Sequence, residues 1–326
     1  MRYLTRRLVH AGFLFIGVSF FSFALLQWAP GDFFDELRLN PRISAQTIDG
    51  LRAEYGLDQS LPVRYERWLA SIAQGDLGYS IAYNSPVGPL IAVRARNTLV
   101  LTGCAMIVAW ALAIPLGIYT AASRRSWLSR SIGVATSTLL TIPDLLLFLC
   151  LLLLAVRTGW VPAGGMFSAS TTLDATGADA ALWPNIKDLA AHLFLPAAGL
   201  ALVTLPALIR HVRSAMIDVL DSPFLRAARG HGIPRARLLF HYALPVAANP
   251  LISLFGFSIA TMLSASLIAE VVLSWPGLGP LLIEATLSRD VYVVVATVLL
   301  SAGFLVFGIL VSDLLLFAVD PRIRQE

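Results

Sequence analysis

Long runs of apolar residues, separated by short polar segments, dominate the pattern along the chain. A helix needs about 20 apolar residues to span the hydrocarbon of a bilayer, where an unpaired backbone amide costs several kcal/mol. Six runs meet that length: 8–28, 98–121, 132–156, 190–210, 246–273 and 291–313. Pro196 and Pro206 interrupt the fourth run. The pattern predicts an all-α integral membrane protein of about six transmembrane helices.

The same pattern divides the chain into three predicted domains. Residues 1–28 form an N-terminal transmembrane helix, 29–97 an external region, and 98–326 a core with five further helices and a cytoplasmic loop, 212–245. Apolar residues at spacings of three and four predict two short amphipathic helices in the external region, over 43–55 and 63–73. The segment 157–189 shows no such periodicity and is predicted to be irregular.

Charge sets the predicted orientation of the chain. Only 13% of the residues are charged and the mean hydropathy is +0.75, whereas soluble domains carry about a quarter charged residues. Arginines cluster in the short segments before the first span, between the second and third, between the fourth and fifth, and after the sixth. Because basic residues resist translocation, both termini are predicted to be cytoplasmic. These clusters indicate contact with membrane lipid rather than nucleic acid.

The cytoplasmic segment 221–245 carries the most informative motif. Ser222 is a good N-cap, Pro223 suits the first helical position, and Gly232 suits a left-handed stop, which together predict a short helix. We expect this helix to display Phe224, Leu225 and Ala228 to the cytosol. Such an apolar surface favours binding of a protein partner.

This segment resembles the cytoplasmic Glu-Ala-Ala loop of binding-protein-dependent ABC importer permeases. Ala227, Ala228, Gly232 and a Leu-Pro pair match the family pattern, while Arg226 replaces its glutamate and Tyr242 its isoleucine. An arginine at the first position is similar to the oligopeptide, dipeptide and nickel branch. Further motifs of that branch are Ala29-Pro-Gly-Asp32, Tyr55-Gly-Leu-Asp58, Gly75-Asp-Leu-Gly78, Ser274-Trp-Pro-Gly-Leu-Gly279 and Asp320-Pro-Arg322.

The resemblance implies a type I ABC importer permease-like bundle that imports di- or oligopeptides from the inner membrane. It also implies a second homologous permease, two ATPase subunits and an external solute-binding protein as partners. The residues it assigns to the ATPase-coupling loop are Ser222, Pro223, Phe224, Leu225, Arg226, Ala227, Ala228, Gly232, Leu244 and Pro245. The only lysine, Lys187, lies in a predicted external loop, so the chain lacks the lysine of an ATP-binding P-loop and is not itself an ATPase.

Ionisable residues inside the spans are the candidates for a translocation path. Asp144 lies mid-span, where a carboxylate is costly unless it faces water or a partner. Either it lines the path and favours substrates with a free amino terminus, or it bonds to a Ser or Thr of a neighbouring helix. Glu270 and Asp313 lie near span ends, where they are expected to reach the interface and to have structural roles. The histidines, including His192, have no carboxylate or cysteine at ligand spacing, so neither a metal nor a cofactor is expected.

Two other classes of protein account for part of the pattern. A stand-alone secondary transporter accounts for six spans and Asp144 but gives no reason for a capped cytoplasmic helix. A membrane-embedded enzyme requires a cluster of polar catalytic groups that the pattern lacks. Within the family, nickel chelates, glutathione and oligosaccharides are the alternative substrates to peptides.

Overall fold

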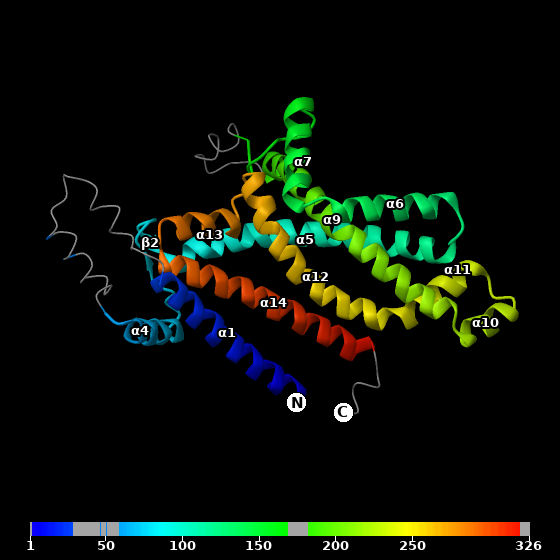
Figure 1. The fold of residues 1–326 in the computed structure, drawn as a ribbon, viewed down its shortest axis with the longest axis horizontal. Helices are drawn as coiled ribbons and strands as arrows, with labels where there is room; N and C mark the ends of the chain where they lie inside the picture. Colours follow the sequence, from blue (N-terminus) through cyan, green and yellow to red (C-terminus); the bar gives the residue numbers. More distant parts are fainter. Residues whose placement is uncertain (1, 29–45, 47–49, 51–58, 169–181, 320–326) are drawn as a thin grey trace. The chain divides into compact units, whose positions relative to one another are not determined.

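The computed structural model describes residues 2–28, 46, 50, 59–168 and 182–319. Apart from one two-stranded hairpin, the elements found there are helices (Figure 1). In order they are α1 (Arg2–Trp28), α4 (Leu61–Ala73), β1 (Tyr79–Ser80), β2 (Ser85–Pro86), α5 (Val87–Ala122), α6 (Trp127–Thr141), α7 (Asp144–Thr158), α9 (Leu182–Leu220), α10 (Pro223–Gly230), α11 (Arg235–Arg237), the π-helix η1 (Leu238–Ala243), α12 (Leu244–Val272), α13 (Leu278–Leu287) and α14 (Val291–Val319).

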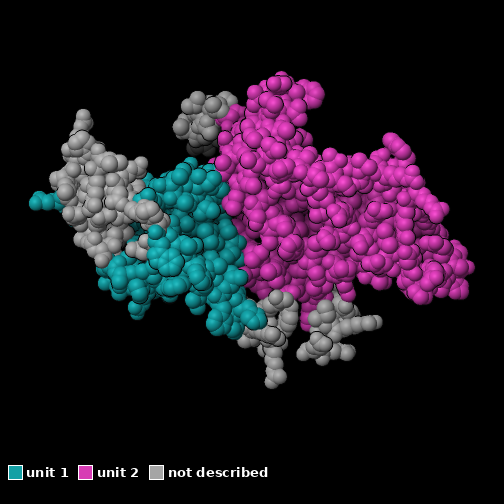
Figure 2. Space-filling model, in the orientation of Figure 1, with its two compact units in different colours: residues 1–97, 277–303 teal, residues 98–276, 304–326 magenta. Residues whose placement is uncertain are grey.

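The chain divides into two compact units, coloured separately in Figure 2. Unit 1 contains residues 1–97 and 277–303, and unit 2 contains 98–276 and 304–326. Each unit therefore combines segments that are distant in the sequence. The three-domain division expected from the sequence stays a prediction.

The third predicted span, 132–156, is wrong as one continuous helix. Among the described residues, five helices are long and apolar enough to cross a membrane, and the sixth candidate is the pair α6 and α7, which bend by 104° at their junction. Pro143 lies at this junction with extended backbone angles, as does Ile142 before it. Proline disfavours the helical conformation of the residue before it and cannot donate a backbone hydrogen bond. The apolar run continues through the junction, although the helix does not.

Other helix bounds also differ from the sequence-based expectation. The second span begins at Val87 rather than at 98, because Val87, Ile91 and Ala95 recur every four residues and all are buried. The helix α9 extends over the fourth span in both directions, so residues 182–189 of the segment expected to be irregular are helical. The predicted helix over 63–73 is confirmed as α4. Apart from residues 46 and 50, the predicted helix over 43–55 lies outside the described residues.

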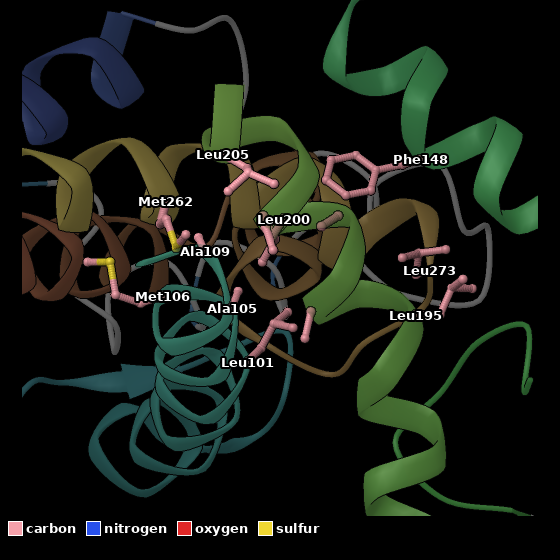
Figure 3. Close-up of a cluster of buried hydrophobic side chains, with 14 of the residues drawn as sticks. Leu101, Ala105, Met106, Ala109, Phe148, Leu195, Leu200, Leu205, Met262 and Leu273 are labelled. Carbon is pink, nitrogen blue, oxygen red and sulfur yellow. The ribbon is translucent and has the colours of Figure 1, made fainter. Parts of the chain in front are cut away.

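The largest core of unit 2 lies where α5, α7, α9 and α12 meet. In Figure 3, Leu101, Ala105 and Ala109 of α5 lie beside Leu200 of α9, with Met262 contributed by α12 and Leu273 by the residue directly after α12. Phe148 of α7 covers Gly199, where an added Cβ would lie 2.8 Å from the phenyl ring. The small residues of α5 and the glycine of α9 thus let large side chains from neighbouring helices fill the core.

Within unit 2, α12 and α14 approach each other closely through small residues. A Cβ at Gly256 would lie 2.5 Å from Ser312, and one at Gly308 would lie 2.9 Å from Ile259. The close approach lets Ser312 Oγ donate to the carbonyl oxygen of Ile252 at 2.7 Å. Small residues promote helix association in membranes in this way, because lipid supplies no hydrophobic driving force between helices.

In unit 1, α4 packs on α1 and leads into the hairpin β1–β2. The ring of Phe23 lies 5.0 Å from that of Trp68, measured between centroids, and Tyr65 Oη lies 2.8 Å from Ser19 Oγ. Gly75 and Gly78 have φ angles of 84° and 96°, which side-chain-bearing residues rarely adopt. The motif 75–78 is therefore explained by the tight turn that brings α4 to the hairpin.

A buried carboxylate attaches this hairpin to α14 within unit 1. Asp290, which precedes α14, accepts hydrogen bonds from Ser80 Oγ at 2.6 Å and from the backbone N–H of Ala82 at 3.2 Å. The backbone N–H of Val293 donates to the other carboxylate oxygen at 3.3 Å. Asp290 thus serves at once as the N-terminal cap of α14 and as the anchor of the hairpin.

Tyr83 adds a second polar contact near the tip of the same hairpin, where its hydroxyl donates to Glu284 of α13. Burial of the phenol, together with this hydrogen bond and the negative charge of Glu284, raises the pKa of Tyr83 to about 12.

Candidate functional site

The helix α10 at the centre of segment 221–245 forms where its sequence predicts it. Ser222 Oγ accepts from the backbone N–H of Leu225 at 3.3 Å, and Pro223 occupies the first turn, where a missing N–H is harmless. After the helix ends, Gly232 has a φ of 78°. The predicted cap, start and left-handed stop are confirmed.

The face that α10 displays is narrower than expected. Phe224 is 54% exposed, whereas Leu225 is fully buried and Ala228 nearly so. Leu225 and Ala228 pack into a cluster with Val212 and Met216 of α9. The expectation that all three apolar residues face the cytosol is therefore wrong, because α10 uses two of them to attach itself to its own chain. Phe224 is the large apolar side chain left on the outer surface of α10, beside the small exposed Pro223 and Ala227.

The exit from this segment combines a π-helix with a proline. The π-helix η1 ends at Ala243, and α12 begins with Leu244 and Pro245. Pro245 cannot donate to the carbonyl four residues earlier, and its ring would clash with that carbonyl in a regular α-helix. The wider π turn provides room there, so the chain continues as helix from α11 through to Val272.

Two arginines attach the segment to the turn between α5 and α6. Arg124 donates from Nη2 to both carboxylate oxygens of Asp221 at 2.9 Å. Arg235 donates from its own Nη2 to the carbonyl oxygen of Ala122 at 2.6 Å. Sequence reasoning missed both contacts, since the partners are about a hundred positions apart. The available signal was the acidic Asp221 in an otherwise basic region.

Asp144 lies in the first turn of α7, directly after the bend between α6 and α7. Its side chain is half-buried. A carboxylate at a helix N-terminus is stabilised by the aligned backbone N–H groups, by about 0.3–1 kcal/mol at exposed sites. This placement therefore lowers the free-energy cost of an ionised carboxylate at Asp144. Asp144 lies on a different segment of the chain from the α10 residues.

Glu270 is fully buried, so the expectation that it reaches the interface is wrong. Thr98 Oγ1 donates to its carboxylate at 2.6 Å, and the backbone N–H of Trp275 donates to the Glu270 carbonyl at 2.8 Å. Trp275, from the motif 274–279, is also fully buried. Both contacts indicate a structural role for Glu270 at the end of α12. The motifs at 29–32, 55–58 and 320–322 lie outside the described residues.

The described part of the chain contains no cluster of three or more His, Cys, Asp or Glu residues that could hold a metal ion. His192 does have a carboxylate nearby, contrary to expectation: its Nδ1 lies 3.2 Å from Asp188 Oδ1 and 2.9 Å from the Asp188 carbonyl. A single carboxylate and a single imidazole hold the end of α9 but do not make a metal site.

Family comparisons agree with the geometry of a helical bundle that carries a capped loop helix. The family described as "Binding-protein-dependent transport system inner membrane component" matches residues 113–325, and its N-terminal part matches 1–102. The chain belongs to this family. It is thus a multi-pass permease subunit of an ABC importer, and ATP is hydrolysed by a separate subunit. A solute-binding protein is the other partner that the family implies.

Relatives cover the permease from end to end. It is 35% identical over 324 residues to the oligopeptide transport system permease protein AppB of Bacillus subtilis, covering 99% of each chain. It is 33% identical over 341 residues to the dipeptide transport system permease protein DppB of Escherichia coli K12, covering 100% of this chain and 99% of that one.

A solved structure, the inward-facing MetNI methionine ABC transporter, shares the fold of the permease. The match has a TM-score of 0.57 at 16% identity and covers 71% of this chain and 96% of the other. The fold class expected from the motifs is confirmed.

Proposed function

We propose that this permease forms half of the translocation path of an importer for di- and oligopeptides. A second homologous permease forms the other half, and two ATPase subunits and a solute-binding protein complete the assembly. The observation that carries the proposal is end-to-end similarity, at 35% and 33% identity, to permeases named for oligopeptide and dipeptide transport.

Uptake by the reconstituted importer tests the substrate. We expect saturable, ATP-dependent uptake of labelled dipeptides and pentapeptides into proteoliposomes that contain the full complex and its binding protein. Glutathione, a nickel chelate and an oligosaccharide serve as the competing substrates. Uptake of one of these three without uptake of peptides would refute the peptide assignment and leave the family membership intact.

We further propose that α10 is the contact through which the ATPase moves the permease. The proposal is supported by the exposed Phe224 on a short helix whose opposite face is anchored by Leu225 and Ala228. Exposed aromatic residues are frequent energetic anchors of protein interfaces, and their loss costs about 2 kcal/mol or more. In this arrangement, closure of the ATPase pair moves Phe224, and the buried anchors transmit the movement to α9.

The variant Phe224→Asp tests this coupling without disturbing the core of the chain. We expect substrate-stimulated ATPase activity of the purified complex to fall by about tenfold or more. Phe240→Asp is the matched control, since Phe240 is 52% exposed in the same segment but lies outside α10. Equal losses in both variants, or full activity in Phe224→Asp, would exclude α10 as the coupling contact.

For Asp144 we propose a role in the path, where it attracts the free amino terminus of a peptide. Support comes from its half-buried position at the bend between α6 and α7, where a helix end meets a break in the backbone. Asp144→Asn should lower uptake of a free peptide by about tenfold relative to its N-acetylated form, because one charge pair is lost. The control is Asp76→Asn, an exposed carboxylate of unit 1. An equal effect on both peptides would assign Asp144 a structural role.

Both termini are proposed to be cytoplasmic, with region 29–97 outside and the core 98–326 carrying the cytoplasmic loop. This topology requires an even number of crossings, so α6 and α7 together must cross once. Each helix has 15 residues and is about 22 Å long, shorter than a bilayer core of about 30 Å. Reporter fusions at both ends decide the matter: opposite sides would make the bent pair a re-entrant loop.

A further inference from the structure

A cavity of about 990 Å³ lies beside the loop helix, entirely within unit 2. Its walls come from the turn between α5 and α6, the end of α9, the helix α10, and the start of α11 and η1. Five arginines line the cavity against one acidic residue: Arg124, Arg125, Arg226, Arg229, Arg235 and Asp221. The cavity is therefore strongly electropositive.

The arginines divide into two that build the cavity wall and three that remain available. Arg124 is bound to Asp221, and Arg235 is bound to the Ala122 carbonyl, so these contacts close the wall between the two loops. The side chains of Arg125, Arg226 and Arg229 are exposed, and their guanidinium groups form no hydrogen bond or ion pair with the rest of the described chain. Three available guanidinium groups around one cavity repel one another unless an anion lies between them.

The chemistry and location of the cavity indicate its occupant. Guanidinium groups bind phosphate oxygens through paired, charge-assisted hydrogen bonds. A concave cavity admits a small head group rather than a protein surface. Ser126 lines the cavity, and the next residue, Trp127, is 80% exposed at the start of α6, one of the apolar helices of the bent pair. Exposed Trp beside Arg is typical of the level of lipid head groups.

We propose that this arginine-lined cavity binds the phosphate head group of an anionic phospholipid. Arg125 approaches the phosphate from the turn between α5 and α6, and Arg226 and Arg229 approach it from α10. The acyl chains extend along the apolar surface that begins at Trp127 and Leu128. A bound lipid thus adds a further contact between the turn from α5 to α6 and the helix α10.

Titration of the purified full-length chain with phosphatidylglycerol, followed by native mass spectrometry, tests the site. We expect retention of one phosphatidylglycerol in preference to phosphatidylcholine. Affinity should fall about fivefold in Arg125→Gln and about 25-fold in Arg125→Gln/Arg229→Gln, from the usual contribution of a basic residue near an anionic lipid surface. Arg130→Gln, a matched control on α6 outside the cavity lining, should change affinity less than twofold.

Four results would overturn the proposal. Equal weakening by Arg130→Gln would indicate diffuse attraction to the membrane surface. Retention of inorganic phosphate with the same dependence on Arg125, without selectivity for phosphatidylglycerol, would assign the cavity to a soluble anion. Displacement of the lipid by purified ATPase subunits would assign it to the partner protein. Unchanged lipid affinity in the double variant would show that the cavity is not the site.

Discussion

The hairpin 79–86 of unit 1 and the loop 221–245 of unit 2 are both short segments fixed to helices, but by opposite means. The hairpin is fixed by a buried carboxylate, because Asp290 accepts from Ser80 and from a backbone N–H of the hairpin. The polar contacts of the loop, such as Arg124 with Asp221, are exposed to solvent. Buried Leu225 and Ala228 provide its firm attachment.

The difference is one of directionality. A buried, hydrogen-bonded carboxylate specifies both distance and angle, and leaving its partners unsatisfied is costly. Apolar contacts are non-directional, and exposed ion pairs are weak, so a segment held by them can shift while remaining attached. A loop proposed to transmit movement is thus held by contacts that tolerate movement, whereas the hairpin is held rigidly.

The largest effect should follow from removing the rigid anchor. Asp290→Ala leaves the Ser80 hydroxyl and two backbone N–H groups without an acceptor, so we expect a loss of about 4 kcal/mol in the free energy of unfolding. Denaturant titration of the chain in mild detergent measures it. Asp76→Ala, an exposed acceptor for Gly78 N–H, should cost less than about 1 kcal/mol. Similar losses of unfolding free energy in Asp290→Ala and Asp76→Ala would show that the buried carboxylate is not a special anchor of the hairpin.

Removing the apolar anchor of the loop should have the next largest effect. Leu225→Ala creates a cavity in the cluster with Val212 and Met216, at an expected cost of about 3 kcal/mol in the same unfolding measurement. Phe224→Ala, on the adjacent exposed position, should cost less than about 1 kcal/mol. If Phe224→Ala proved the more destabilising of the two, the assigned faces of α10 would be reversed.

Alkaline pH should weaken the hairpin before it weakens the loop. The pKa of Tyr83 is raised in the folded state from 10.0 to about 12, so its stabilising effect is complete below pH 10 and is lost as pH rises towards 12. Because the phenol is partly exposed, we expect only about 1 kcal/mol from this source. Unfolding titrations across that pH range, compared with Tyr83→Phe, isolate the effect. A variant with the same pH dependence as wild type would contradict it.

The smallest effect is expected at the exposed ion pair of the loop. Arg124→Ala and Asp221→Ala should each cost about 0.5 kcal/mol, because both side chains are well exposed, at 41% and 61%. A double-mutant cycle separates the pair interaction from other changes at either residue. A coupling energy above about 2 kcal/mol would show that the loop, like the hairpin, is held by a strong polar contact.

Sequence patterns predicted the features that depend on local chemistry. Ser222, Pro223 and Gly232 determine where α10 begins and ends, and each acts within a few residues of itself. Pro143 gave an equally local signal, but the long apolar run around it favoured a continuous span, and that interpretation was wrong. At the ends of α10 and at Pro143, local backbone chemistry predicted the helix boundaries better than the length of the apolar run did.

Features that depend on distant partners could not be predicted. The burial of Glu270 depends on Thr98, which is 172 positions away along the chain. The inward direction of Leu225 depends on α9, and a helix as short as α10 has too few residues to define its buried face by periodicity. The arginine-lined cavity likewise exists only once two separate loops meet.

The glycine contacts between α12 and α14 also constrain how the protein is made. Ribosomes synthesise α12 before α14, so Gly256 enters the bilayer before Ser312 exists to cover it. Until then the Ile252 carbonyl lacks the hydroxyl that later donates to it. The packing of α12 is therefore completed only when α14 has been synthesised. A nascent chain that stops just before Gly308 would lack the contact between α12 and α14, even if its earlier helices had inserted correctly.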